Sequence, residues 1–215
     1  MLLDFFSDVL GWTYAISLGF FLYPQILWNW QRRSVRGLSI DFLTYSFVGF
    51  LCYSVFTLTF YLNNEIQEEY KRRHASENLV RFNDVIFALH GAVASLVLII
   101  QTQVYRGSAQ HLSTMAAFVT WLSILGGILV AASVHYGNGE WIHLIYYLSA
   151  VKLAFDTIQY LPQAWLNYKR KSTRALSCSL ITLTLVGGLC SIAQLVLDAY
   201  IERDWSGIQG DAVKL

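Results

Sequence analysis

Long apolar runs separated by short polar segments fill the chain from end to end. Six runs are long enough to cross a bilayer as helices: 9–30, 42–62, 85–105, 112–134, 141–168 and 175–197. Five of them contain no Asp, Glu, Lys or Arg, and none shows the alternation of a strand. Because backbone amides in hydrocarbon must pair within their own segment, the pattern predicts an all-α polytopic membrane protein with six transmembrane helices in a single membrane domain, 1–215.

Composition agrees with this prediction and narrows the function. Of the 215 residues, 55% are hydrophobic and 13% are charged, which is about half the charged share of a soluble domain. A net charge of +1 gives no sign of a nucleic-acid partner. The apolar composition makes the lipid bilayer the expected surrounding. The sequence has no glycine-rich phosphate loop, metal-ligand cluster or nucleophile motif. We therefore expect a protein that is not an enzyme and binds no cofactor or metal.

Basic residues predict the orientation of the helices. The connections after the first, third and fifth runs carry Arg and Lys, with no acidic residue before Asp41. The positive-inside rule places these connections on the cytoplasmic side and both chain ends on the opposite side. The connection 63–84 mixes basic and acidic residues and is the one conflicting signal. Asp4 and Asp8 stand where a leader would carry positive charge, so we expect no cleaved leader.

One segment of the chain occurs twice. Residues 23–39 recur 138 positions later as 161–177, with eight of 17 aligned residues identical. The same offset aligns Gly49 with Gly187, without a gap. The sequence therefore contains an internal duplication.

The duplication predicts how the helices are grouped. Four crossings separate the copies, so they form parallel repeats related by an axis along the membrane normal. The first repeat, 9–105, has three helices, and the second, 141–197, has two, with 112–134 as a linker helix. Asp84, which opens the third helix, shifts by the offset to position 222, so we expect the seventh helix to be absent from this sequence.

Two ionisable residues lie near the middle of the fifth run. Lys152 and Asp156 each cost roughly 2.5 to 3.5 kcal/mol there on the scale of insertion experiments. Their i,i+4 spacing lets them pair on one helix face. Two interpretations follow: a buried ion pair that only locks the helix, or a substrate or proton pathway.

Both copies place a proline near the end of a helix. Pro24 and Pro162 remove one intrahelical hydrogen bond each, so we predict local hinges. Two amide side chains follow each proline one turn apart, namely Gln25 with Asn29 and Gln163 with Asn167. These amides either bind a polar solute or bond helices to each other.

Two more groups could titrate on the predicted lumenal side. Asp84 opens the third run and His90 lies inside it. Either they handle protons, or Asp84 caps its helix and His90 is a neutral imidazole bonded between helices.

These residues resemble the PQ-loop family, and within it the lysosomal cystine/proton symporters. The matching residues cover almost the whole chain: 23–42, 49–50, 53–56, 83–85, 89–90, 152–154, 160, 162–164, 167, 171–173 and 187–188. The resemblance implies a SWEET-like fold of two triple-helix bundles and a linker. It also implies that L-cystine is exported with protons across the lysosomal or vacuolar membrane. By the same resemblance, the cystine site is lined by Gln25, Lys152, Tyr160, Gln163 and Asn167, and protons couple at Asp84.

Several positions depart from the family pattern. The family aspartate before Gly-Gly is Thr184 here, and the asparagine four residues earlier is Leu180. We hypothesise that Asp156 replaces the lost carboxylate in proton coupling. Two alternatives follow from the departures: transport of another amino acid, cationic or neutral, and a membrane protein that does not transport.

Overall fold

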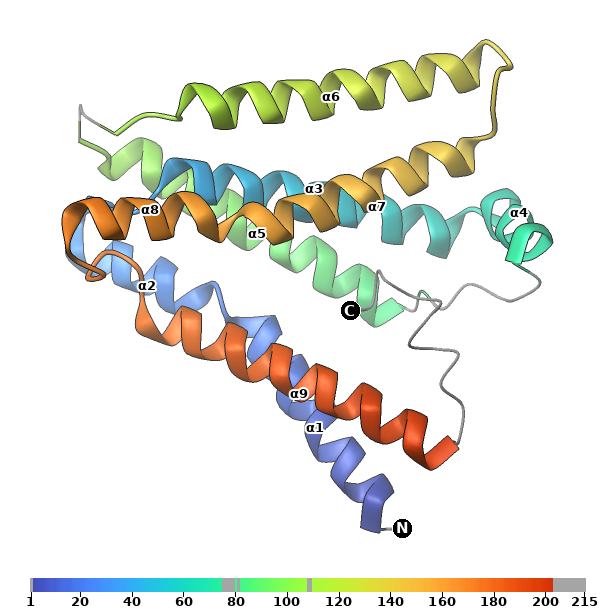
Figure 1. The fold of residues 1–215 in the computed structure, drawn as a ribbon, viewed down its shortest axis with the longest axis horizontal. Coiled ribbons are helices and arrows are strands. Elements are labelled where there is room, and N and C mark those ends of the chain that lie inside the picture. The colour runs from blue at the N-terminus through green and yellow to red at the C-terminus, as the bar shows by residue number, and fades with distance from the viewer. Residues whose placement is uncertain (1, 75–79, 81, 108–109, 203–215) are drawn as a thin grey trace. The chain divides into compact units, whose positions relative to one another are not determined.

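The structure is a computed structural model that describes residues 2–74, 80, 82–107 and 110–202 (Figure 1). Nine helices lie within these ranges: α1 (Leu2–Phe20), α2 (Tyr23–Arg32), α3 (Ile40–Leu62), α4 (Asn64–His74), α5 (Phe82–Tyr105), α6 (Thr114–His135), α7 (Trp141–Ile158), α8 (Tyr160–Arg170) and α9 (Cys178–Glu202). The part of the chain described contains no strand. The predicted all-α class is confirmed.

Five spans in the described residues are long and apolar enough to cross a membrane: Phe5–Arg32, Ile40–Leu62, Asp84–Tyr105, Thr114–His135 and Cys178–Ile201. They coincide with five of the six predicted runs. The remaining run, 141–168, is helical in two pieces, α7 and α8, and α7 carries the charges of Lys152 and Asp156. These charges lower its hydropathy, so its crossing of the membrane stays a prediction.

Helix α4 was not predicted, because the connection that contains it has no apolar run. One side of α4 is nevertheless buried, through Ile66 and Glu69. Arg73, one turn after Glu69, binds its carboxylate with an Nη2 to Oε1 distance of 2.9 Å. Arg73 also forms an ion pair with Glu140, directly before α7. Helix α4 is thus attached to the N-terminal end of α7.

The chain divides into two compact units. The first consists of residues 1–31 and 176–215, of which 2–31 and 176–202 are described. In this unit α1 packs along α9 in the antiparallel direction, because Ser7 bonds to Asp198 while Ser17 and Leu18 lie at Gly187. A Cβ at Gly187 would come within 2.7 Å of the Leu18 side chain. The missing side chain allows the close helix approach that is typical of membrane proteins.

The second unit consists of residues 32–175. Helix α3 packs along both α5 and α7, and α6 packs along α7. The rings of Tyr45 and Phe155 join α3 to α7 with centroids 5.1 Å apart. Tyr147 of α7 donates its hydroxyl proton to the Ser123 carbonyl of α6 at 2.7 Å.

Each unit combines helices from both sequence copies. The first helix of one copy packs on the second helix of the other: α1 on α9, and α7 on α3. The 138-residue offset relates the two contacts, because Gly187 with Leu18 in the first unit corresponds to Gly49 with Asp156 in the second. The grouping of each copy into its own three-helix bundle stays a prediction.

Candidate transport site

Both proline-bearing helices are broken at equivalent places. Helix α1 ends at Phe20 before α2 begins at Tyr23, and α7 ends at Ile158 before α8 begins at Tyr160. Proline has no N–H, so Pro24 and Pro162 leave the carbonyls four residues earlier without their usual helical donor. Those carbonyls belong to Phe20 and Ile158, the last residues of α1 and α7. The breaks therefore lie where the prolines dictate, and movement at them stays a prediction.

Gln163 holds the beginning of α3 within the second unit. The side chain is 1% exposed, and its Oε1 accepts a hydrogen bond from the Ser39 backbone N–H at 2.7 Å. Its Nε2 donates to the Gly37 carbonyl at 3.1 Å and to Asn167 Oδ1 at 2.8 Å. Ser39 is itself the N-cap of α3, because its hydroxyl accepts from the Phe42 N–H. Both amide donors and the oxygen of Gln163 are occupied.

Gln25 makes the equivalent contact in the first unit. The side chain is fully buried, and Oε1 accepts from the Ser177 N–H at 2.7 Å, directly before α9. Its Nε2 donates to Asn29 Oδ1 at 2.8 Å. Each glutamine thus accepts a hydrogen bond at the start of the second helix in the other copy. The first backbone N–H groups of a helix have no acceptor within the helix, and the glutamine oxygen provides one for such a group. In this conformation both amides bond helices to each other, which was one of the two predicted alternatives.

The sequence contains a signal for these helix starts besides the hydrophobic pattern. Ser39 and Ser177 recur at the same place in both copies, close to the start of an apolar run, and serine is a common N-cap residue. The distant glutamine that completes each cap could not be assigned, because 124 residues separate Gln163 from Ser39.

Lys152 and Asp156 form the ion pair that their spacing predicts. Lys152 Nζ lies 3.0 Å from Asp156 Oδ2, and the two side chains are 22% and 37% exposed. Lys152 Nζ also lies 4.9 Å from the ring centroid of Tyr53 on α3, a cation–π contact. Gly49 of α3 faces the carboxylate, because a Cβ there would be in ordinary van der Waals contact with Asp156 Oδ1, at 3.4 Å. A charged pair is thus held between α7 and α3.

The first unit has a different chemistry at the equivalent positions. The offset relates Lys152 to Tyr14 and Asp156 to Leu18. The packing of the two helix pairs is similar, yet only the second unit places charges in it at these positions. This asymmetry sets the α3–α7 contact apart as a candidate site.

Two other predicted substrate residues lie in the second unit. Tyr160 begins α8, directly after the break, and its ring packs on Phe42 of α3 with centroids 5.3 Å apart. Asn167 accepts from Gln163 and also lines a cleft at the end of α8. The second unit therefore contains four of the five predicted substrate residues, while Gln25 belongs to the first unit.

The predicted proton-handling residues Asp84 and His90 lie on α5. Both are half-buried and both take part in interactions. Asp84 is in the first turn of α5, where the helix dipole favours a negative charge. The described residues include no group of three or more His, Cys, Asp or Glu side chains that could hold a metal ion.

The three connections that carry the basic residues meet at one end of the second unit. Gln110 donates to the Val35 carbonyl at 2.9 Å, and Arg32 donates to the Arg174 carbonyl at 3.1 Å. Asp41 accepts from the Ser113 N–H at 2.8 Å. One shared end is what the predicted orientation requires, since all three connections should lie on the same membrane face.

A model of the PQ loop repeat matches the chain twice, at residues 6–66 and 144–202. The two matches begin 138 positions apart, at the offset of the duplication. The chain belongs to the PQ-loop family. The glutamines and prolines described above are those of its two PQ-loop repeats.

Relatives of this PQ-loop protein share most of its length. Cystinosin of Drosophila melanogaster is 38% identical over 97% of the chain and 53% of the relative, so the chain spans about half the length of that protein. A cystinosin homologue of Dictyostelium discoideum is 35% identical over 99% of the chain and 75% of the relative. A protein of Saccharomyces cerevisiae named as a cystine transporter is 26% identical over 88% of the chain and 78% of its own length. The chain is thus cystinosin-like, and these names agree with the prediction that it is not an enzyme.

Proposed function

We propose that this PQ-loop protein exports L-cystine, together with protons, from the lysosome or vacuole by alternating access. The observation that carries the proposal is the Lys152–Asp156 ion pair between α7 and α3, in a predicted span where charge is costly. The name of the yeast relative, a cystine transporter, supports the choice of substrate.

The ion pair suggests how substrate and proton are coupled. A proton from an acidic lumen binds Asp156 and neutralises its carboxylate, which releases the Lys152 ammonium from its 3.0 Å contact. Lys152 then pairs with a carboxylate of cystine. When the site faces the cytoplasm, cystine leaves, Asp156 loses its proton to that side, and the ion pair forms again. Each cycle thus carries at least one proton with the substrate.

The remaining predicted residues have supporting roles in this proposal. Tyr160 and Asn167 contact the substrate on α8, further along the transport path than Lys152, and Pro24 and Pro162 act as hinges between the two access states. Gln163 has both amide donors occupied, so it contacts cystine only after releasing Gly37 or Asn167. Gln25 likewise would have to exchange its contact with Asn29.

Asp84 and His90 form a second group in the proposed proton pathway. They lie on α5, which packs along α3, the helix that also contacts the ion pair. Protonation of Asp84 would weaken its interaction with the helix dipole and so favour one access state over the other.

Transport of a different amino acid is the second candidate. Leu180 is fully buried, and the Thr184 hydroxyl is used within α9 by donating to the Leu180 carbonyl at 2.9 Å. The resemblance to the family would place an asparagine and an aspartate at these positions. The loss of these polar groups favours an altered substrate, either cationic or neutral.

Counterflow in proteoliposomes distinguishes the candidates. We expect labelled cystine to accumulate against unlabelled cystine when the lumen is acidic, and not against unlabelled lysine or arginine. Accumulation driven by lysine or arginine would support the second candidate. If no solute gave counterflow, and circular dichroism showed that the reconstituted sample was folded, the result would indicate a protein that does not transport.

A further inference from the structure

Basic residues are concentrated around the end of α8. The proposed transport cycle does not involve them. The two PQ loops contain seven basic residues between them: Arg32, Arg33, Arg36, Lys169, Arg170, Lys171 and Arg174. The loops lie against each other, because Arg32 donates to the Arg174 carbonyl and the Arg170 guanidinium lies directly over Gly37. Gly37 has φ of +89° and has no side chain that would collide with Arg170. The basic side chains are therefore brought together, although like charges repel.

Three of these basic residues have no acidic partner within the part of the chain that the structure describes. Among the residues that the structure describes, Arg33, Arg36 and Lys171 form no ion pair with an acidic side chain. The nearby Asp41 accepts a hydrogen bond from the Ser113 N–H at the start of α6. The helix dipole at the end of α8 offsets part of the charge, since it favours cations at the last turn. The remaining charge is exposed, so it can attract an anion from outside the chain.

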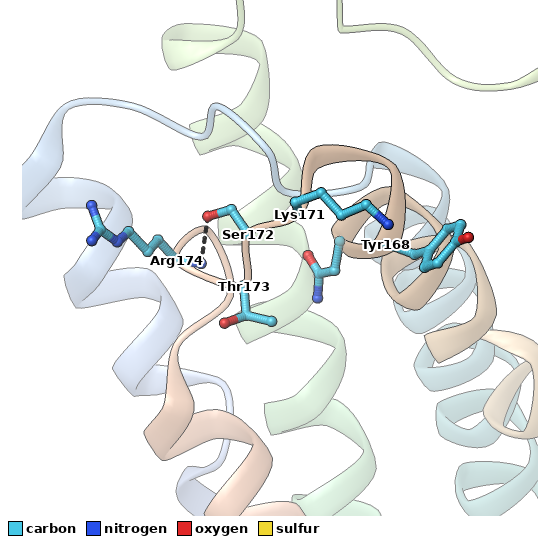
Figure 2. Close-up of a pocket in the computed structure, with 6 residues that line it drawn as sticks. Tyr168, Lys171, Ser172, Thr173 and Arg174 are labelled. Carbon is cyan, nitrogen blue, oxygen red and sulfur yellow. Dashed lines mark hydrogen bonds between the residues drawn. The ribbon is translucent and has the colours of Figure 1, made fainter.

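The second loop also forms a cleft of about 450 Å³ (Figure 2). The cleft is lined by Asn167, Tyr168, Lys171, Ser172, Thr173 and Arg174. Lys171 and Arg174 leave the loop in different directions, with Ser172 and Thr173 between them, and Lys171 extends towards Tyr168 (Figure 2). Two cations that flank two hydroxyl groups are a donor set suited to a phosphoryl group.

Hydrogen bonds within the loop hold its backbone in place. Lys171 ends α8 in the left-handed conformation, with φ of 51°, and Ser172 N–H bonds back to the Asn167 carbonyl at 3.2 Å. The Ser172 hydroxyl accepts from the Arg174 N–H at 3.4 Å. Lys171 Nζ rests 4.0 Å from the Tyr168 ring centroid, a weak contact that an anion can replace.

We propose that this cleft binds the phosphoryl headgroup of an anionic lipid. The predicted orientation places the cleft at the cytoplasmic face, where anionic lipids are enriched and a basic pocket beside a membrane helix attracts their headgroups. The cleft shares Asn167 with the proposed substrate residues, but it lies at the end of α8 and not at the ion pair on α7, and its ligand is not the transported solute. A free phosphate ion has the same chemistry, and the experiment distinguishes these two sources.

The test measures binding to the purified full chain in detergent by isothermal titration calorimetry. The probes are dioctanoyl phosphatidylinositol 4-phosphate, dioctanoyl phosphatidylcholine and inorganic phosphate. We expect the first to bind, phosphatidylcholine not to bind, and inorganic phosphate to bind at least tenfold more weakly. The variant K171Q/R174Q should lose roughly 30-fold in affinity, equivalent to about 1 kcal/mol for each basic side chain.

The duplication supplies the matched control. R33Q/R36Q removes the same number of charges at the equivalent positions of the first loop and should change affinity less than threefold. Thr173→Val introduces the residue that the first loop has as Val35, so it should fold, and it should lose about fivefold if the hydroxyl contributes one hydrogen bond. Equal losses in the two double variants would overturn the proposal, because diffuse charge would then explain binding. So would a Thr173→Val variant with unchanged affinity, inorganic phosphate that binds as tightly as the lipid, or no binding at all.

Discussion

Gln163 Oε1 lies 2.7 Å from the Ser39 backbone nitrogen, although 124 residues separate the two in sequence. Gln25 has the same relationship to Ser177, at the same distance. The glutamine of one copy thus completes the helix start of the other copy, and this happens in both directions. The PQ motif therefore combines two roles in adjacent residues: the proline ends a helix, and the glutamine fixes the start of another.

Replacing Gln163 by Leu should destabilise the protein by about 1–3 kcal/mol. The change leaves the Ser39 N–H and the Gly37 carbonyl buried without their partner, and a buried polar group without a hydrogen bond costs about that much. Chemical unfolding in mixed micelles measures the free energy. Gln103→Leu is the control, because Gln103 is exposed on α5 and its replacement should change stability by less than about 0.5 kcal/mol. Similar values for both variants would show that the cap contributes little.

A side chain at Gly187 should separate α1 from α9. In Gly187→Ala the new methyl group would come within 2.7 Å of the Leu18 side chain, and overpacking of this kind typically costs about 1–3 kcal/mol. The neighbouring Gly188→Ala provides a control, because a Cβ there would meet no atom within 4 Å. Thermal unfolding of the two variants in the same detergent checks the prediction. A lower stability for Gly188→Ala than for Gly187→Ala would contradict the packing described here.

Loss of Arg73 should release α4 from α7. Arg73 binds both Glu69 and Glu140, and Glu69 is only 7% exposed, so the substitution Arg73→Ala leaves a buried carboxylate without its partner. Hydrogen exchange of the amides in 64–74 should become several-fold faster. Arg72→Ala, at an exposed neighbouring position, should leave these rates unchanged. Unchanged exchange in both variants would mean that α4 is held by Ile66 and its apolar contacts alone.

Local sequence features predicted much of this fold, and long-range contacts account for what they missed. The transmembrane helices, the two breaks and the Lys152–Asp156 pair depend on residues within one or two turns of each other, so the sequence pattern was sufficient. Helix α4 escaped prediction because its charged sequence is stabilised by Glu140, which lies far along the chain. The contact of Lys152 with Tyr53 could not be predicted either, because it depends on how α7 packs on α3.

The substitution Lys152→Met should abolish cystine counterflow. Methionine has a similar length but provides no charge for the substrate carboxylate, and it leaves Asp156 without its partner. Lys169→Met is the control, since Lys169 is exposed and lies over the Trp165 ring, away from the ion pair on α7. Both variants should reconstitute with wild-type yield. Wild-type counterflow in Lys152→Met would show that the ion pair only stabilises α7 and does not serve transport.

The most direct test of proton coupling at the ion pair is the pH dependence of counterflow in Asp156→Asn. Asparagine keeps the shape of the side chain and cannot gain or lose a proton, so it mimics the protonated state of Asp156. We expect labelled cystine to exchange at similar rates at acidic and neutral lumenal pH in this variant, while the wild type is faster at acidic pH. An Asp156→Asn protein with the pH dependence of the wild type would contradict the proposal that Asp156 couples proton movement to transport.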